Sequence, residues 1–345
     1  MIRHSFLDDY SEGAHPIILK ALSETNLVQQ VAYGDDNYSN EARKLIKAHM
    51  EGVDPDVWFV ASGTLANILS ISSVLRPHEA VIAAASGHIV VRETGAIEAT
   101  GHKIITVPPI DGKLTPQSIE SALNANAHFP HMAKPRLVYI SNATEVGTVY
   151  TKSELQAISA LCKTRGLLLL VDGARLGAAL SAAKNDLTLA DIAKLADIFW
   201  IGGTKVGALI GEAIVIPNNS LRDDFAFHIK QRGALLAKGR ILGLQFRELF
   251  RDGLYFRLAD HANQMASQLS MAISDAGYGF AAATETNQLF PIIPNDMIEK
   301  LKTQFDFYVW EPYNDGSSVI RLVTSWATDE SCVKDFTATL NKYTK

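Results

Sequence analysis

Cysteine is scarce in this sequence. Only Cys162 and Cys332 occur among 345 residues, far apart and without CxxC or metal-ligand spacing. This usage is typical of reduced thiols in a cytoplasmic protein and argues against a disulfide framework. Long apolar runs are also absent, and the N-terminal stretch MIRHSFLDDYSEG lacks the apolar core of a signal peptide. We therefore expect a cytoplasmic protein that makes no contact with a membrane.

Charge of one sign is not concentrated anywhere along the chain. The net charge is −5 and no dense stripe of Lys and Arg is present, which argues against nucleic acid as a partner. Several chemical motifs are missing too: there is no HExxH, no metal-spaced cluster of His and Cys, and no GxSxG. Neither GxGxxG nor GxxxxGK[ST] occurs, so dinucleotide-binding and P-loop folds lose support. We expect no metal site.

The sequence does contain a regular alternation of strand-like and helix-like segments. Apolar runs predict strands at 57–61, 79–85, 102–108, 136–142, 167–174, 196–203 and 212–217. Segments between them predict helices at 64–75, 93–101, 114–125 and 153–166. The run LLLLVDGA is apolar nearly throughout, as a strand covered on both faces should be. The pattern predicts an α/β domain with a mostly parallel central sheet.

The character of the chain changes near residue 221. A long helical stretch is predicted at 221–250, a second helix at 252–277, and short strands at 287–294 and 319–327. We interpret residues 1–249 as a large α/β domain that includes the N-terminal segment. Residues 250–345 are interpreted as a smaller C-terminal α+β domain, which the long helical stretch joins to the first.

Lys205 stands alone in the run FWIGGTKVGALIGEAIVIP, where one buried strand turns back into another. A single Lys in a turn is usually a surface residue, but glycines and aliphatic residues flank this one and limit its access to water. Partial burial lowers the pKa of an ammonium group and produces an amine nucleophile. Such a lysine can form a Schiff base with an aldehyde cofactor.

Asp172 ends the apolar strand LLLLVDGA, where a buried carboxylate is costly unless a positive group meets it. The residue either caps the following turn or acts as the counter-ion of a protonated heterocycle. The pyridine nitrogen of pyridoxal 5'-phosphate (PLP) fits the second role. Arg175, three residues further on, either pairs with Asp172 or donates to the phenolate of the cofactor.

Other candidates also follow predicted strands, where α/β sheets bind their ligands. In SGTLAN, Gly63 and Thr64 open a helix whose N-terminus favours an anion, although many turns look alike. His88 is either a packed structural residue or a group that stacks on a flat cofactor or moves a proton. Arg321, alone among apolar neighbours, suits a substrate carboxylate or a salt bridge with Glu311.

The chain resembles the low-specificity L-threonine aldolase family, of the beta-eliminating lyase group of fold-type I enzymes, which use PLP. The motifs that carry the resemblance follow one another in family order and span nearly the whole chain: DDYSEGAHPIIL, YGDD, SGTLAN, GHIVVRETGAIEATGHK, ISNATEVGTVYT, VDGARLGAAL, GGTKVGALIGEAIV, IKQRGALLAKGR, TNQLFPIIPN and VIRLVTSWAT. DGAR together with GGTK at this separation is specific, whereas SGTLAN alone is not. The resemblance implies a PLP-dependent transferase-like large domain.

The resemblance also implies roles for particular residues. Lys205 would carry PLP, Asp172 would keep its pyridine nitrogen protonated, and Arg175 would bind its phenolic oxygen. The remaining assignments are phosphate contacts for Gly63, Thr64 and Thr204, ring stacking for His88, a place near the substrate's β-hydroxyl for His131, and substrate contacts for Arg321, Asp9, Ser11 and Tyr33. A base, a water held by His88 or His131, would take the hydroxyl proton.

The reaction implied is retro-aldol cleavage of L-threonine, L-allo-threonine and related β-hydroxy-α-amino acids to glycine and an aldehyde. The resemblance further implies a homodimer or homotetramer with shared active sites, in which the region of Tyr33, Lys230 and Lys238 reaches a neighbouring subunit. The chain departs from the family pattern at Leu65, Ala85, Val90, Arg92 and Val206, where the family more often has Gln, Asp, Asn, His and Asn.

Two alternatives stay open at this point. The same scaffold supports β-elimination or racemisation of amino acids, which yield pyruvate with ammonia or a D-enantiomer. The apolar replacements at Leu65 and Val206 instead suit a non-catalytic descendant that binds a ligand, because these side chains cannot donate hydrogen bonds. Retention of Lys205, Asp172 and Arg175 argues against that second alternative.

Overall fold

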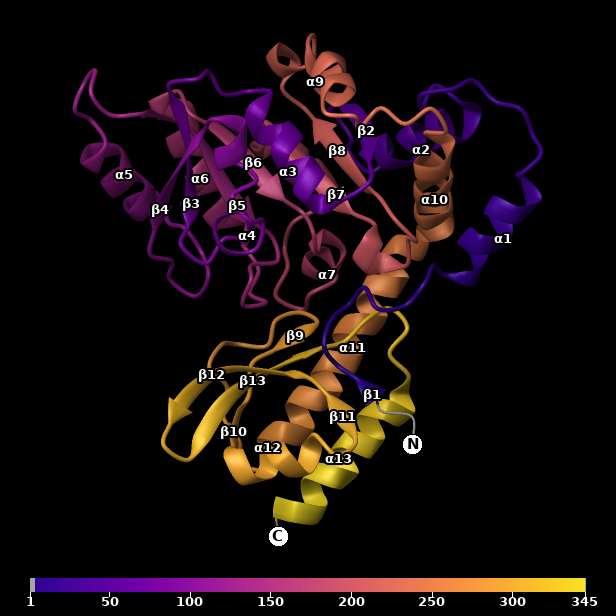
Figure 1. Ribbon diagram of the computed structural model, residues 1–345, viewed down its shortest axis with the longest axis vertical. Helices are drawn as coiled ribbons and strands as arrows, with labels where there is room; N and C mark the ends of the chain where they lie inside the picture. The colour runs from indigo at the N-terminus through magenta and orange to yellow at the C-terminus, as the bar shows by residue number, and fades with distance from the viewer. Residues whose placement is uncertain (1–3, 345) are drawn as a thin grey trace.

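The computed structural model describes residues 4–344. Figure 1 shows a larger part with a wide central sheet and a smaller part beneath it, where both ends of the chain are marked. The long helix α11 (Leu254–Asp275) runs from the larger part into the smaller one. In the part of the chain that is described, no helix is both long and apolar enough to cross a membrane.

The central sheet has seven strands in the order β2-β8-β7-β6-β5-β3-β4. Their bounds are β2 (Asp56–Val60), β3 (Glu79–Ala84), β4 (Lys103–Val107), β5 (Lys134–Ser141), β6 (Leu168–Asp172), β7 (Ile198–Gly202) and β8 (Glu212–Ile216). Neighbouring strands from β4 to β7 are parallel, and only β8 runs antiparallel to its neighbours β7 and β2. The predicted fold class is confirmed, with each predicted strand of this sheet displaced by no more than two residues at either end.

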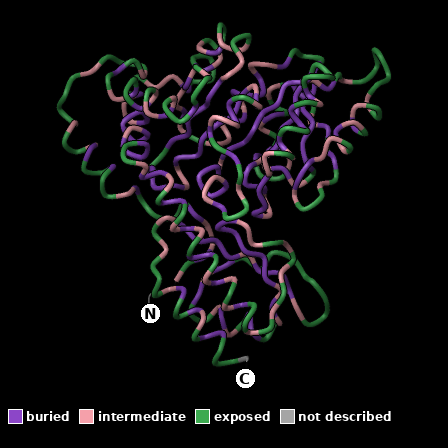
Figure 2. The backbone as a smooth tube through the Cα atoms, turned by 180° about the vertical axis from the view of Figure 1, so that it is seen from behind, coloured by how far each residue is buried: buried purple, intermediate pink, exposed green. Residues whose placement is uncertain are grey.

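Alternate residues of the buried strands enter two separate cores. In β6, Leu169 and Val171 pack on one face of the sheet, and Leu168 and Leu170 pack on the other. A strand that points every second side chain to the opposite face must be apolar at every position when helices cover both faces. Figure 2 shows this buried interior of the larger part inside a shell of exposed loops and helix faces.

Helices cover both faces of this sheet. They are α1 (Pro16–Glu24), α2 (Asn37–Lys47), α3 (Gly63–Ser72), α4 (His88–Val91), α5 (Pro116–Ala125), α6 (Lys152–Arg165), α7 (Leu176–Leu180), α8 (Leu189–Leu195), α9 (Phe225–Gln231) and α10 (Arg240–Phe250). Short 3-10 turns occur at η1 (Glu98–Thr100), η2 (Thr204–Val206), η3 (Asn219–Leu221) and η4 (Arg251–Gly253). Local sequence fixes several ends: a capping box of Thr151 and Glu154 starts α6, and the left-handed Gly166 ends it.

The helix predicted at 93–101 is wrong. α4 ends before this segment, and only the short turn η1 lies within it. Thr94 and Gly95 have φ angles of 53° and 72°, in the left-handed region that interrupts a helix.

The long helical stretch predicted at 221–250 is also wrong, because it is two helices separated by a loop. Gly233 has a φ of 70° just after α9. Gly239 lies just before α10 and close to Gly34. A Cβ atom on Gly239 would stand 2.7 Å from the backbone nitrogen of Gly34. The connection between the two parts is made by α11 instead, which contributes Leu258 to the larger core and Leu269 to the smaller one.

The smaller part contains two short sheets and two further helices. β13 (Ser317–Val323) pairs with β12 (Tyr308–Asn314), β10 (Ile292–Pro294) and β9 (Gln288–Leu289), and α12 (Asn295–Leu301) and α13 (Glu330–Thr344) pack beside them. The described chain begins here: β1 (His4–Ser5) pairs with β11 (Phe305–Asp306), and Phe6 enters the smaller core. The division of the chain at residues 249 and 250 stays a prediction.

Gly173 permits a close approach between the ends of β6 and β7. A Cβ atom at this position would lie 1.8 Å from the carbonyl oxygen of Trp200. The amide of Gly202 donates to the carbonyl of Gly173 at 2.9 Å, so the two strand ends are hydrogen-bonded where they approach. The glycine after Asp172 is therefore a packing requirement of the edge at which the strands end.

Replacing Gly173 with Ala should destabilise the protein by about 2–3 kcal/mol, because the backbone must move to admit the methyl group. Denaturant unfolding measures this change in the free energy of unfolding. Gly279→Ala is the matched control, since no atom lies within 4 Å of a Cβ built there, and its effect should stay within about 0.5 kcal/mol. Equal effects of the two substitutions would contradict the prediction.

Candidate active site

A cavity of about 410 Å³ opens where β5, β6 and β7 end. The structure brings seven of the predicted residues to its wall: Gly63, Thr64, His88, Asp172, Arg175, Thr204 and Lys205. The carboxyl ends of parallel strands share one edge of a sheet, which explains how residues distant in sequence meet here. Tyr10 comes from the N-terminal segment and also lines the cavity.

Asp172 is buried and held by three donors. The Tyr139 hydroxyl donates to Oδ2 at 2.5 Å, Asn67 Nδ2 donates to the same oxygen at 3.0 Å, and the amide of Ala174 donates to Oδ1 at 2.9 Å. Burial raises the pKa of Tyr139 well above its usual range, and the charge of Asp172 adds to the effect, so the hydroxyl keeps its proton. The carboxylate is fixed in place and has lone pairs left for a ligand in the cavity.

Lys205 lies in η2, directly after β7, with partial exposure. Burial, and then the charge of Arg175, lower the pKa of its ammonium group to about 8. Within residues 4–344, no acceptor is hydrogen-bonded to Lys205 Nζ, which lies 5.9 Å from the ring centre of Tyr10. A partly buried amine with a lowered pKa and no acceptor is suited to act as a nucleophile.

Glu212 turns back toward the same site from β8. Its carboxylate accepts from the Gly203 amide at 2.8 Å and from the Thr204 hydroxyl at 2.9 Å. Burial raises the pKa of this carboxyl group above its usual range. Sequence reasoning did not assign Glu212 to the site, although a lone acid in an apolar strand was a usable signal.

His88 is oriented by buried polar partners. Its Nδ1 lies 2.7 Å from Glu93 Oε1, and Asn67 Nδ2 donates to the same oxygen at 2.8 Å. The His88 amide donates to Glu145, whose pKa is raised by burial. Sequence reasoning missed Asn67, Glu93 and Glu145. Asn67 was recognisable as a polar residue at a helix position that faces the core.

Arg175 forms a bidentate ion pair with Asp9. The Nε and Nη2 atoms donate to Asp9 at 2.8 and 3.0 Å, and Asn287 Nδ2 donates to the same carboxylate at 2.9 Å. Burial alone raises the pKa of Asp9, but the charges of Arg175 and Lys205 and the hydrogen bonds outweigh it and lower the pKa to about 2. Asp9 therefore links the N-terminal segment, the smaller part and the cavity wall.

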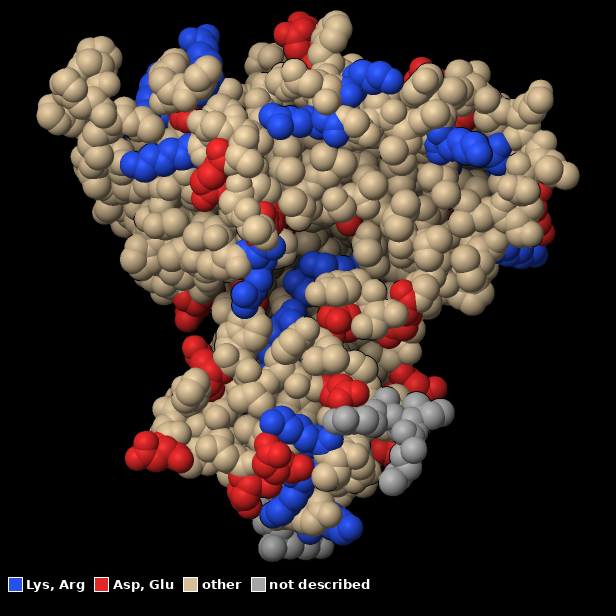
Figure 3. All heavy atoms as spheres, viewed as in Figure 1, with Lys and Arg blue, Asp and Glu red and all other residues tan. Residues whose placement is uncertain are grey.

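Arg321 lies on β13, close to Tyr10 and Arg175 but outside the cavity wall. Its Nη2 donates to Gln288 at 2.8 Å and its Nη1 to the carbonyl of Leu7 at 3.4 Å, while Nε is buried without a partner. Burial lowers the pKa of this guanidinium to about 10, so it stays charged at neutral pH. Figure 3 shows Lys and Arg side chains gathered at the hollow waist between the two parts.

Five predicted residues do not line the cavity of the described chain: Asp9 and Arg321, which lie beside it, and His131, Tyr33 and Ser11. His131 lies in an exposed loop before β5, beside His128. Ser141, at the other end of β5, lines the cavity. The eight residues of β5 span about 25 Å and separate His131 from the cavity. Tyr33 lines a different, smaller pocket, with Lys230 Nζ 4.9 Å from its ring centre. The Ser11 hydroxyl donates to Asp8 at 2.7 Å and does not line the cavity either.

A family model described as Beta-eliminating lyase matches residues 8–295. The chain belongs to the beta-eliminating lyase family. This beta-eliminating lyase is similar to the low specificity L-threonine aldolase of Pseudomonas sp. (strain NCIMB 10558). The two chains are 37% identical over 341 residues, which cover 96% of each chain. The resemblance that the sequence motifs predict is therefore confirmed.

Solved structures agree with this assignment. The structure of a threonine aldolase from Leishmania major aligns with a TM-score of 0.97 and 50% identity, and the alignment covers 99% of this beta-eliminating lyase and all of the other chain. An aspartate aminotransferase from Thermus thermophilus aligns with a TM-score of 0.71 at 11% identity, over 99% of this chain and 91% of that one. The second likeness shows the fold alone, which is that of fold-type I enzymes.

Proposed function

We propose that this beta-eliminating lyase is a PLP-dependent aldolase that cleaves L-threonine, L-allo-threonine and related β-hydroxy-α-amino acids to glycine and an aldehyde. The observation that carries the proposal is that Lys205 and Asp172 line one cavity, in a chain that closely resembles threonine aldolases. An amine nucleophile and a fixed carboxylate are the two groups that PLP chemistry requires of a protein.

The residues present fit PLP. Lys205 Nζ has no acceptor within the described residues, as expected of an amine that forms a covalent bond to an aldehyde. Asp172 would hold the protonated pyridine nitrogen, and Arg175, whose Nη1 is left over by its ion pair, would donate to the phenolic oxygen. When bound, PLP supplies an electron sink for the electrons released when the Cα–Cβ bond breaks.

The cavity also offers a place for a phosphate group. Ser62, Gly63 and Thr64 form the N-terminal end of α3, where free backbone amides favour an anion. Gly63 packs directly against Trp200, since a Cβ atom there would stand 2.9 Å from the ring of Trp200. We assign Gly63, Thr64 and Thr204 to phosphate binding. His88 would stack on the ring of the cofactor.

The chain's own residues would bind and deprotonate the substrate. Arg321 would hold the α-carboxylate, with Asp9 and Ser11 at the same end of the site. His88 is oriented by Glu93 and would remove the β-hydroxyl proton in one of two ways. It would either accept the proton itself or hold a water molecule that accepts it. His131 lies too far away for this role within one chain, so any contribution from it would come from a neighbouring subunit.

We further propose a homodimer or homotetramer with shared active sites, in which the region of Tyr33, Lys230 and Lys238 reaches a neighbouring site. Exposed apolar side chains on α1 and the loop that follows support the association: Ile17, Leu19, Leu27, Val28, Val31 and Tyr33. Figure 1 shows α1 and this loop on the outer side of the larger part. Light scattering should give two or four times the mass of one chain, and a monomer would contradict the proposal.

The first experiment is a visible absorbance spectrum of the purified protein with added PLP, followed by L-threonine and an acetaldehyde assay. A band from lysine-bound PLP together with acetaldehyde and glycine would support the proposal. A band with pyruvate and ammonia, or with a D-enantiomer, would replace it with elimination or racemisation. The absence of any band would favour the non-catalytic alternative.

Covalent uptake of PLP by the cofactor-free protein should depend on pH. Lys205 can attack the aldehyde only as the free amine, and its pKa is about 8. The rate of uptake should therefore rise about tenfold per pH unit up to pH 8 and then level off. Stopped-flow absorbance between pH 6 and pH 10 measures it. A rate that keeps rising steeply to pH 10 would indicate an ordinary lysine instead.

A further inference from the structure

Two arginines from different parts of the molecule share one tryptophan ring. The guanidinium carbon of Arg92 lies 5.4 Å from the ring centre of Trp310, and that of Arg321 lies 5.5 Å from the same centre. Arg92 follows α4 in the larger part, whereas Trp310 and Arg321 lie on β12 and β13 of the smaller one. Phe290 packs edge-on against Trp310 and fixes its orientation.

Neither arginine has an acidic partner among residues 4–344. Arg321 donates only to neutral oxygens, and its Nε atom is buried without an acceptor. Arg92 is exposed, and within the described residues its side chain forms no hydrogen bond or ion pair. Arg175, by contrast, is neutralised by Asp9. Two guanidinium groups beside one ring repel each other, so an anion placed between or beside them is favoured.

Both charges lie beside the proposed substrate-binding end of the cavity, outside the residues that form its wall. Arg92 directly follows α4, which begins at His88, so one short segment of the chain carries both residues. Arg321 lies close enough to Tyr10, a residue of the cavity wall, for the charge of each to affect the pKa of the other.

We propose that Arg92 is a specificity-determining residue that binds a second carboxylate, carried on the β-carbon of the substrate. This inference rests on the proposed aldolase function. The α-carboxylate occupies Arg321, which leaves Arg92, held by Trp310, as a further cation without a partner. A guanidinium group binds a carboxylate through paired N–H donors, and the aromatic ring holds it ready to do so. L-Threonine, with a methyl group at this position, has nothing to offer Arg92.

The substrate class is therefore that of β-hydroxy amino diacids, with 3-hydroxyaspartate as the smallest member. Its cleavage follows the reaction already proposed: the β-hydroxyl loses a proton, the Cα–Cβ bond breaks, and Cα takes up a proton. The products are glycine and glyoxylate, which together contain all atoms of the substrate. No oxidant or reductant is needed.

The test compares kcat/KM of the holoenzyme for L-3-hydroxyaspartate, both β-epimers, and for L-3-hydroxyasparagine. These substrates have nearly the same size and differ in one charge. The wild-type enzyme should favour the acid at least tenfold, mainly through KM, and Arg92→Gln should reduce this preference to twofold or less. Arg92→Lys should retain part of it, because a point charge remains. No preference in the wild type, or its survival in Arg92→Gln, would overturn the proposal.

Arg76→Gln is the matched control, since it removes the same charge from an exposed residue before β3, at the opposite edge of the sheet. Its acid-to-amide preference should equal that of the wild type. Glycine and acetaldehyde release from L-threonine is measured in parallel, so a failure of the aldolase function is recognised separately. Calorimetric titration with L-aspartate and L-asparagine, which carry no β-hydroxyl, gives the same charge preference without catalysis. A ratio of dissociation constants that Arg92→Gln leaves unchanged would refute the role of Arg92.

Discussion

Lys205→Ala should lose activity by a factor on the order of 10³ or more and take up no covalent PLP, yet remain folded. The nucleophile is removed, and no other lysine lines the cavity of the described chain. Stability should stay within about 1 kcal/mol of the wild type or rise, because the substitution also removes a poorly solvated ammonium group without an acceptor. The carboxyl group of Glu212 can then take up a proton, since burial already raises its pKa.

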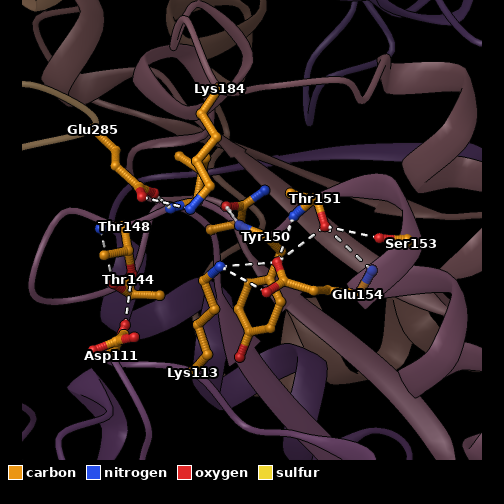
Figure 4. Close-up of polar contacts among 12 residues, drawn as sticks. Asp111, Lys113, Thr144, Thr148, Tyr150, Thr151, Ser153, Glu154, Lys184 and Glu285 are labelled. Atoms are coloured by element: carbon orange, nitrogen blue, oxygen red, sulfur yellow. Dashed lines mark hydrogen bonds and ion pairs between the residues drawn. The ribbon is translucent and has the colours of Figure 1, made fainter. Parts of the chain in front are cut away.

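Lys113 provides the matched control, because it is a buried lysine with a purely local partner. Figure 4 shows its Nζ atom between the two carboxylate oxygens of Glu154, at distances of 3.0 and 2.8 Å. Its stem also passes the ring of Tyr150, 5.5 Å from Nζ to the ring centre. Lys113→Met should lower the free energy of unfolding by about 1–2 kcal/mol and leave activity in place.

Both variants are tested by three measurements: activity, the visible absorbance band and urea unfolding. The two substitutions should have opposite effects. Lys205→Ala should abolish activity without lowering stability, and Lys113→Met should lower stability without abolishing activity. A Lys205→Ala protein that still bound PLP covalently and cleaved threonine would remove the basis of the proposed function.

Asp9→Asn should destabilise the protein by about 3–5 kcal/mol, because Arg175 would keep its charge at a mostly buried position without a counter-ion. Asn287 would also face an amide in place of the carboxylate to which it donates at 2.9 Å. Activity should fall as well, since the ion pair holds Arg175 at the cavity wall. Urea unfolding and kcat measurements test both statements.

The same carboxylate predicts a pH window for stability. In the unfolded chain Asp9 has its ordinary pKa of 3.8, and in the folded protein the pKa is about 2. Between these values only the unfolded chain binds the proton, so the stabilisation is present above pH 4 and lost as the pH falls toward 2. The difference between wild type and Asp9→Asn should shrink by about 2.5 kcal/mol across this window. Asp54→Asn, at an exposed carboxylate that pairs with Lys47, is the control and should show no comparable window.

Much of the architecture could be predicted because its signals are local. The apolar runs of β6 and β7 define buried strands, and Thr151, Glu154 and Gly166 define both ends of α6. The cavity wall could be predicted in part for a related reason: strand ends meet at one edge, so Asp172 and Lys205 had to lie near each other.

The remaining contacts depend on partners that are distant in sequence. Nothing near Arg175 indicates that its counter-ion is Asp9, 166 positions earlier in the chain. The sequence predicts Glu93 in a helix, but its carboxylate is buried against His88 and Asn67 while the backbone turns away at Thr94. His131 is the opposite case. The family resemblance implies a place for it in the site, but it precedes β5, whose far end reaches the cavity, so it lies at the other edge of the sheet.

The pairing of β1 with β11 has a consequence for the order in which the protein is completed during synthesis. Asp9 and Tyr10 leave the ribosome well before the strand that anchors their segment, which ends at Asp306. The larger part can form its sheet while translation continues, because domains fold as units when their sequence is available. The cavity wall that contains Tyr10 and Arg175 can be completed only after the smaller part has emerged. A truncated chain that ends before residue 305 should therefore keep much of the sheet and lack a finished site.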